Sequence, residues 1–206
     1  MLYVFVIKKN KGDIAPFALS DILNKYATIF NNDIVISFPG YMSKKRKTIT
    51  DFRKNLKLTN NVYFTEGMNG NSNLLDVVGV KIQDEYNNQY GSKMAKIISK
   101  KDHSKILFFL DPKSKGEDSV IVKAILIGSS NQSYESYFNT PAKKGEADVF
   151  IVDGATIEKD DKRVEERLVS IYNELDETIR KNVILTKEIS KGNPEYLNDL
   201  FKKITS

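Results

Sequence analysis

The sequence predicts an α/β domain in which helices cover both faces of a mixed β-sheet. Runs of β-branched and aromatic residues at 2–7 and 34–38 flank a segment of helical periodicity, and this β-α-β order is typical of layered sheets. Residues 155–206 then carry apolar residues at helical spacing, which predicts a helical C-terminal part. With 206 residues the chain suits a single domain, residues 1–206.

The first half of the chain combines strand and helix signals. Its strand candidates are short apolar runs closed by lysine, glycine, proline or asparagine, and its helix candidates carry apolar residues three or four positions apart. The expected elements are strands at 2–7, 34–38 and 62–65, a helix at 22–29 capped by Ser20 or Asp21, and helices at 49–58 and 74–86.

The second half begins with two strands, 103–109 and 120–127, on either side of a turn-rich segment at 111–116. We expect these strands to pair as a long hairpin. A buried strand follows at 148–152. Apolar residues from Val164 to Ile179 then predict one long amphipathic helix, and a last helix is expected at 194–203.

Composition excludes several classes of protein. The chain is 40% apolar and has ten tyrosines and eleven phenylalanines, which is enough to fill a core. With no cysteine and one histidine, it has no disulfide and no thiolate metal site, which leaves only carboxylate-type sites for a metal held by one subunit, and we do not expect a zinc enzyme. A net charge of +5 and a pI of about 9.1 favour an acidic or phosphate-bearing partner.

Nothing in the sequence predicts membrane targeting. The apolar run at 2–7 is too short for a signal-peptide core, and no segment approaches the length of a membrane span. The expected location is the cytoplasm, although a chain trimmed of a leader would look the same.

A dense basic run, Lys44, Lys45, Arg46 and Lys47, precedes the helix expected at 49–58. One interpretation is a solvated loop. The other is a contact for the backbone of a polyanion such as DNA.

The only histidine of the sequence, His103, opens a predicted strand two residues before Lys105. Because side chains alternate between the faces of a strand, the imidazole and the ammonium emerge on the same side, about 7 Å apart. The pair therefore places two groups that suit phosphate chemistry at a common space.

A second polar group follows the next predicted strand. Gly128 lets backbone approach a ligand closely, and Ser129, Ser130 and Asn131 supply hydroxyl and amide donors that suit phosphate oxygens. Glu146, just before the strand at 148–152, could accept a hydrogen bond from an imidazole nitrogen and so fix its tautomer.

The pattern His103-x-Lys105, Gly128-Ser129-x-Asn131 and Glu146 resembles the signature of the phospholipase D superfamily, and in particular its single-motif nucleases, among them restriction endonucleases of phospholipase D type. The resemblance implies a phospholipase D-like fold and a metal-free site with no cofactor. It implies a nucleophile at His103, phosphate-binding roles at Lys105, Ser129 and Asn131, and a histidine-orienting carboxylate at Glu146.

A site of this type, as the resemblance implies, uses two histidines in opposite protonation states. Since the chain has only one histidine, the second must come from another copy of the chain. We therefore expect a homodimer with the active site on its two-fold axis.

The match departs from the family pattern in two places and leaves one choice open. The interval from Lys105 to Gly128 is longer than usual, which we attribute to a polar segment that extends the hairpin. The family often has an Asp where this chain has Leu110, and Asp111 stands one position later, so no role is assigned to Asp111. Glu135 is an alternative to Glu146, which is preferred for its place before a strand.

The function expected from these features is a metal-independent phosphodiesterase, with an endonuclease acting on DNA favoured because of the basic runs. A restriction role is a family-level inference. Two alternatives stay open: a phospholipid-cleaving or phosphatidyl-transfer enzyme, for which no interfacial helix is evident, and a non-catalytic nucleic-acid-binding module.

Overall fold

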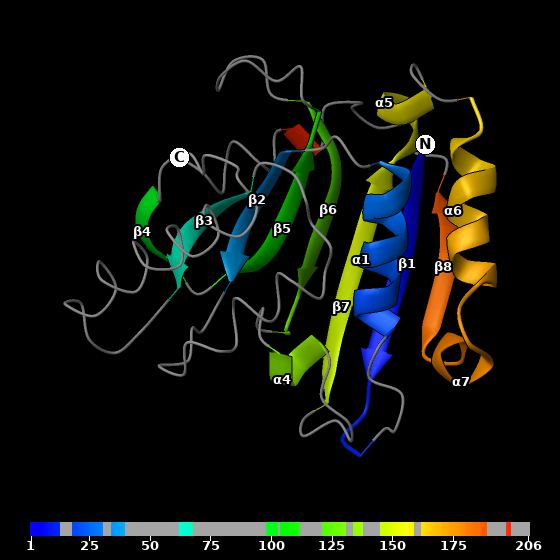
Figure 1. The fold of residues 1–206 in the computed structure, drawn as a ribbon, viewed down its shortest axis with the longest axis horizontal. Coiled ribbons are helices and arrows are strands. Elements are labelled where there is room, and N and C mark those ends of the chain that lie inside the picture. Colours follow the sequence, from blue (N-terminus) through cyan, green and yellow to red (C-terminus); the bar gives the residue numbers. More distant parts are fainter. Residues whose placement is uncertain are drawn as a thin grey trace.

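A computed structural model of the chain describes residues 1–12, 18–30, 34–39, 62–67, 98–102, 104–111, 121–130, 134–137, 145–158, 162–188 and 197–198. These residues form one eight-stranded sheet with helices packed against it (Figure 1). The strands are β1 (Leu2–Lys9), β2 (Ile34–Pro39), β3 (Val62–Gly67), β4 (Ile98–Asp102), β5 (Lys105–Leu110), β6 (Val122–Gly128), β7 (Glu146–Asp153) and β8 (Val183–Glu188).

The sheet is mixed, as the sequence predicts. Its strand order is β4-β3-β2-β5-β6-β7-β1-β8, in which β2, β3 and β4 run parallel and the other neighbours run antiparallel. The predicted hairpin is confirmed, because β5 pairs with β6 from Ile106 opposite Ile127 onward. At its closed end the Asp111 N–H donates to the Ile121 carbonyl at 2.9 Å.

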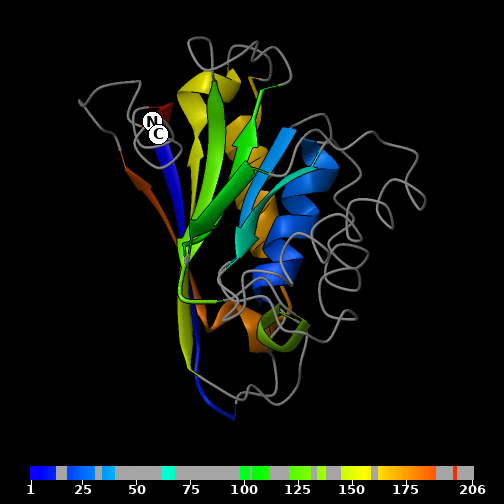
Figure 2. The same cartoon turned by 90° about the vertical axis from the view of Figure 1, so that its left-hand side faces the viewer.

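Five described helices pack against a single face of the sheet (Figure 2). They are α1 (Ala18–Ile29), α4 (Tyr134–Tyr137), α5 (Gly154–Glu158), α6 (Val164–Asn173) and α7 (Glu177–Arg180). On this face the ring of Tyr26 in α1 lies 5.0 Å from each of the rings of Phe109 and Phe150, both in edge-to-face geometry. Such pairs add to the free energy gained by burying the rings.

The opposite face carries a smaller core. Phe108 of β5 and Ile125 of β6 are fully buried there, and Leu197 packs against them. Leu197 is thus the described residue that covers this face from outside the sheet. The α/β class with a mixed sheet is therefore observed: helices cover one face, and the helical residues 197–198 lie against the other.

Two predictions about the C-terminal part are corrected. The single helix expected from Val164 to Ile179 is broken into α6 and α7, because Asp176 leaves helical geometry and its side chain accepts the Thr178 N–H at 2.8 Å as the N-cap of α7. The expected helical part also contains strand β8, whose run Val183-Ile184-Leu185-Thr186 is mostly β-branched.

Other differences are smaller. Helix α1 begins at Ala18, before the predicted caps Ser20 and Asp21, because its apolar stripe starts at the buried Leu19. Strand β4 and helices α4 and α5 were not predicted. The helices expected at 49–58 and 74–86, and most of the one at 194–203, lie outside the described residues. In the described part of the chain, no helix has the length and apolarity to cross a membrane.

Candidate active site

The predicted site residues that the structure describes gather at one end of the sheet. Lys105 opens β5, Gly128 ends β6 and Glu146 opens β7. Because β6 runs antiparallel to both neighbours, these three positions lie at the same end, the lower one beside α4 in Figure 1. His103, Asn131 and the basic run Lys44, Lys45, Arg46 and Lys47 lie outside the described residues.

Strand register aligns these positions in a row across the sheet. Gly128 is the ladder partner of Asp148 on β7, and Lys105 stands one position beyond the pair Ile106 and Ile127, so it falls beside Gly128. Alternation along β5 puts Lys105 on the same face as Leu107, which belongs to the core under α1 and α6. The site residues thus continue the helix-covered face of the sheet beyond its apolar core.

Gly128 makes room for a carboxylate. A Cβ atom at this position would lie 1.8 Å from Asp148 Oδ1 and 2.7 Å from Asp148 Cα, distances that real Cβ atoms do not show. The predicted reason for the glycine was close approach of a ligand. In the structure, the group that approaches its backbone is the side chain of Asp148.

Ser130 lies between two carboxylates. Its N–H donates to Asp148 Oδ1 at 3.1 Å, and its Oγ lies 2.5 Å from Asp148 Oδ2 and 3.0 Å from Glu146 Oε2. Ser130 is only 2% exposed. Its described contacts are therefore with the interior of the protein, and the substrate-binding role of its hydroxyl stays a prediction.

Glu146 is held by three donors from three separate segments of the chain. Its Oε2 forms an ion pair with Lys9 Nζ at 3.0 Å and contacts Ser130, while its Oε1 accepts from Ser136 Oγ of α4 at 3.2 Å. Lys9 also donates to the Ser136 carbonyl. The Lys9 and Glu146 side chains are 10% and 9% exposed, so the pair is shielded from solvent.

Ser129 differs from Ser130 because it is exposed. Its hydroxyl accepts the Ala147 N–H at 3.0 Å, and its own N–H donates to the Ala147 carbonyl at 3.0 Å. These bonds continue the contact between β6 and β7 for one residue beyond the strand. Ser129 therefore lies on the outer side of the cluster of Lys9, Ser130, Glu146 and Asp148, which we call the buried polar cluster.

The electrostatics of the cluster centre on Asp148. Burial raises the pKa of its carboxyl above the ordinary aspartate value, the two hydrogen bonds from Ser130 lower it, the charge of Glu146 raises it and that of Lys9 lowers it. Since burial is the largest of these effects, the pKa is raised overall.

Asp111 and Glu135 are the two other acidic residues that the sequence places near the motif. Asp111 is buried at the far end of β5 from Lys105, where its N–H closes the hairpin, as expected for a turn residue. The backbone of Glu135 belongs to α4, but its side chain is not described. Glu146, by contrast, contacts Ser130 of the Gly128–Asn131 segment directly.

Sequence reasoning missed Lys9, Ser136 and Asp148. Lys9 was assigned to the turn after β1, and Asp148 was counted as the first residue of an apolar strand. A signal was present: Glu146 and Asp148 are two residues apart at the start of a buried strand, which puts two carboxylates on one face. Their lysine partner could not be found without the register that pairs Lys9 with Glu146.

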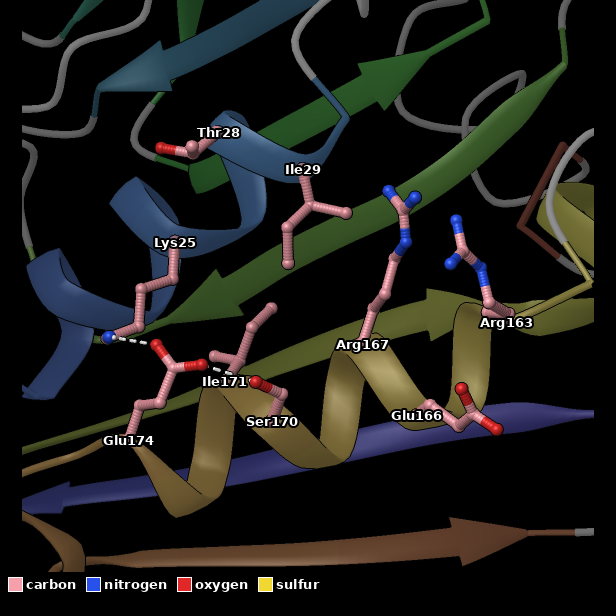
Figure 3. A pocket seen from close by; sticks show the side chains of 9 residues that line it. All are labelled: Lys25, Thr28, Ile29, Arg163, Glu166, Arg167, Ser170, Ile171 and Glu174. Atoms are coloured by element: carbon pink, nitrogen blue, oxygen red, sulfur yellow. Dashed lines mark hydrogen bonds and ion pairs between the residues drawn. The ribbon is translucent and has the colours of Figure 1, made fainter.

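A groove between α1 and α6 is a second candidate region (Figure 3). Its cavity volume is about 570 Å³, and the ion pair between Lys25 and Glu174, at 2.8 Å, bridges it. The Arg163 and Arg167 side chains extend from α6 along its side. None of the residues of the predicted motif lines this groove. Within the described residues, no group of three or more His, Cys, Asp or Glu side chains could hold a metal ion.

Replacing Gly128 by alanine tests the close approach of β6 and β7. We expect Gly128→Ala to lower the free energy of unfolding by about 1–3 kcal/mol, because the new methyl group overlaps Asp148. Gly145→Ala is the matched control, since its Cβ would meet no atom nearer than 3.5 Å. Urea unfolding measures both. Equal stability of the two variants would contradict this packing.

Removing the ammonium of Lys9 tests the ion pair. Lys9→Met should cost about 3–5 kcal/mol of stability, because it leaves a buried Glu146 carboxylate without its counter-charge. The neighbouring Lys8, which is exposed, provides the control Lys8→Met, with little expected effect. Thermal and urea unfolding decide between them, and a small loss at Lys9 would show that the pair is not shielded.

Comparison with known proteins returns no match, since neither a family model, nor a curated protein, nor a solved structure matches the chain. The chemistry of the site is therefore argued from its own residues and their geometry.

Proposed function

We propose that the chain is a metal-independent phosphodiesterase, an endonuclease that cleaves DNA through a phosphohistidine intermediate in an active site shared by two subunits. The proposal includes a phospholipase D-like domain with helical cover on both faces, and a cytoplasmic homodimer. It needs no cofactor.

One observation carries the proposal. The two halves of the motif are far apart in sequence, yet β5 and β6 pair in the register that brings Lys105 of the first half beside Gly128 of the second. Glu146, the third part, contacts Ser130 within the second half. Three segments that resemble one family signature therefore meet at one end of the sheet.

The proposed reaction has two steps. A neutral His103 attacks phosphorus, the bond to the leaving oxygen breaks, and His103 of the partner subunit, as imidazolium, gives that oxygen a proton. Water then attacks phosphorus of the phosphohistidine and gives a proton to His103 of the partner subunit, which is now neutral. The phosphorus–nitrogen bond breaks and releases the first His103. Lys105 and Asn131 of both subunits hold the non-bridging oxygens and offset the developing negative charge.

DNA is the preferred substrate because the basic run from Lys44 to Lys47 and the net charge of +5 suit a polyanion. A phospholipid substrate is the alternative that the same chemistry allows. Cleavage of phospholipid vesicles at a higher turnover than DNA would favour it. Salt-sensitive DNA binding with no cleavage of any substrate would favour a non-catalytic module.

A nuclease assay with EDTA tests the chemistry. Wild-type protein should cleave DNA equally well with and without excess EDTA, and His103→Ala should lower cleavage by about 1,000-fold or more, since it removes the nucleophile. The exposed-surface variant Lys181→Ala is the control and should keep full activity. Circular dichroism checks that all three proteins are folded. Loss of wild-type activity in EDTA would contradict the metal-free reaction.

Mixing subunits tests the shared site. If each site needs one histidine from each subunit, dimers of wild-type and His103→Ala chains are inactive. Activity of co-refolded mixtures should then fall as the square of the wild-type fraction, whereas a site within one chain predicts a linear fall. Mixtures with Lys181→Ala chains control for refolding, and light scattering should give twice the mass of the 23.4 kDa chain.

A further inference from the structure

The hydroxyl of Ser130 has more acceptors around it than it has protons. Its Oγ carries one hydrogen, yet it lies within hydrogen-bond distance of Asp148 Oδ2, at 2.5 Å, and of Glu146 Oε2, at 3.0 Å. If both carboxylates were ionised, the single Ser130 proton could serve only one of these contacts, and the other would bring two oxygen atoms together with no hydrogen between them. A second proton on one of the carboxylates removes this conflict.

Asp148 is the carboxylate placed to hold that proton. Glu146 already accepts from the Lys9 ammonium on Oε2 and from the Ser136 hydroxyl on Oε1, so each of its oxygens has a donor other than Ser130. Asp148 is 4% exposed, and both of its described hydrogen-bond partners belong to Ser130. A proton on Oδ2 lets Asp148 donate to Ser130 Oγ, and Ser130 is then free to donate to Glu146.

We propose that Asp148 is a positioning residue of the phosphodiesterase site, holding a proton that it donates to Ser130 so that Ser130 in turn donates to Glu146. This inference rests on the proposed function for the reaction it supports. The chain of donors runs from Asp148 on β7, through Ser130 after β6, to Glu146 at the start of β7. It fixes the orientation of the carboxylate that the proposed site uses.

The chain of donors also distinguishes the two oxygens of Glu146. Oε2 accepts from Lys9 and from Ser130, which fills its two lone-pair positions. Among the described residues, Oε1 accepts from Ser136 alone. Oε1 is therefore the oxygen that keeps an acceptor position for a further donor, such as an imidazole N–H.

The charged groups of the described residues that act on Asp148 are Glu146 on its own strand and Lys9 on β1. Burial outweighs both and raises the pKa of Asp148, in agreement with the geometry. An aspartate with a raised pKa contributes most to stability below its ordinary pKa, near 3.8, and this contribution is lost as pH rises through the raised value. Ionisation of Asp148 therefore weakens the arrangement on the alkaline side.

Asp148→Asn is the sharpest test, because an asparagine amide can donate to Ser130 Oγ while its carbonyl accepts the Ser130 N–H at every pH. We expect Asp148→Asn to keep the wild-type kcat on DNA where the wild type is most active. Its kcat should persist to higher pH, since the variant cannot ionise. Asp148→Ala should lower kcat by up to about 100-fold with little change in KM, because Glu146 loses its support.

A second arm measures the proton without relying on catalysis. Carbon-13 NMR of the aspartate carboxyls, with the Asp148 signal assigned by its loss in Asp148→Asn, should give a titration midpoint above the ordinary aspartate value. Asp153→Asn is the matched control: Asp153 is buried at the other end of β7, where it caps α5, so its replacement should leave the pH profile of kcat unchanged.

The outcomes separate the two proposals. A midpoint at or below the ordinary aspartate value overturns the protonated Asp148. A raised midpoint with identical pH profiles for wild type and Asp148→Asn, or with Asp148→Asn as impaired as Asp148→Ala, overturns the positioning role. If folded wild-type protein cleaves no phosphodiester, the positioning role falls with the proposed function, and the NMR titration still decides whether Asp148 holds the proton.

Discussion

The contact between the Asp148 carboxylate and the backbone of Gly128 determines how the site end of the sheet is built. Without a side chain at Gly128, β6 and β7 come close enough for Asp148 to bind both polar groups of Ser130. Ser130 is thereby drawn inward to Glu146, while Ser129 turns outward and bonds to the backbone of β7. The absence of a side chain at Gly128 thus allows one of the two following serines to be buried while the other stays exposed.

The buried polar cluster extends the same face of the sheet that carries the aromatic core. Along β7 this face shows Phe150 and Val152 in the core, then Asp148 and Glu146 toward the site, and along β1 it shows Phe5 and then Lys9. Charges at such buried positions are tolerated only when each has partners. The ion pair of Lys9 and Glu146 and the bonds of Ser130 supply them, so the core ends in a polar layer that helps to define strand register.

The sequence predicts much of this fold because strands and helices carry their own periodicity. The apolar runs that form β1, β2, β5, β6 and β7 predict these strands, and the turn-rich segment at 111–116 predicts the hairpin of β5 and β6. The break between α6 and α7 was missed because the apolar spacing continues through it, and only the capping geometry of Asp176 shows where the helix stops. Strand β8 was missed because its residues were included in a C-terminal part expected to be helical, although its run is mostly β-branched.

The candidate site was predictable only where its residues form a pattern along the chain. Lys105, Gly128 and Glu146 belong to such a pattern. Lys9 lies near the N-terminus, far from this pattern in the sequence. Which strand lies beside β7 follows from the strand order, and no local signal states that β1 is inserted between β7 and β8. The counter-charge of Glu146 therefore becomes visible only in three dimensions.

Charge links the buried polar cluster to the phosphate substrate of the proposed function. Lys9 and Glu146 neutralise each other in their ion pair, which leaves Lys105 and Asp148 as the remaining charged candidates among the described residues of this row. An ionised Asp148 would add a second negative charge to the buried polar cluster, beside that of Glu146. A protonated Asp148 removes that charge, which favours the binding of a phosphodiester and the negative charge that develops on it in the proposed reaction. In the proposed site, burial of one carboxyl group thus bears on the electrostatics as well as on the packing of two strands.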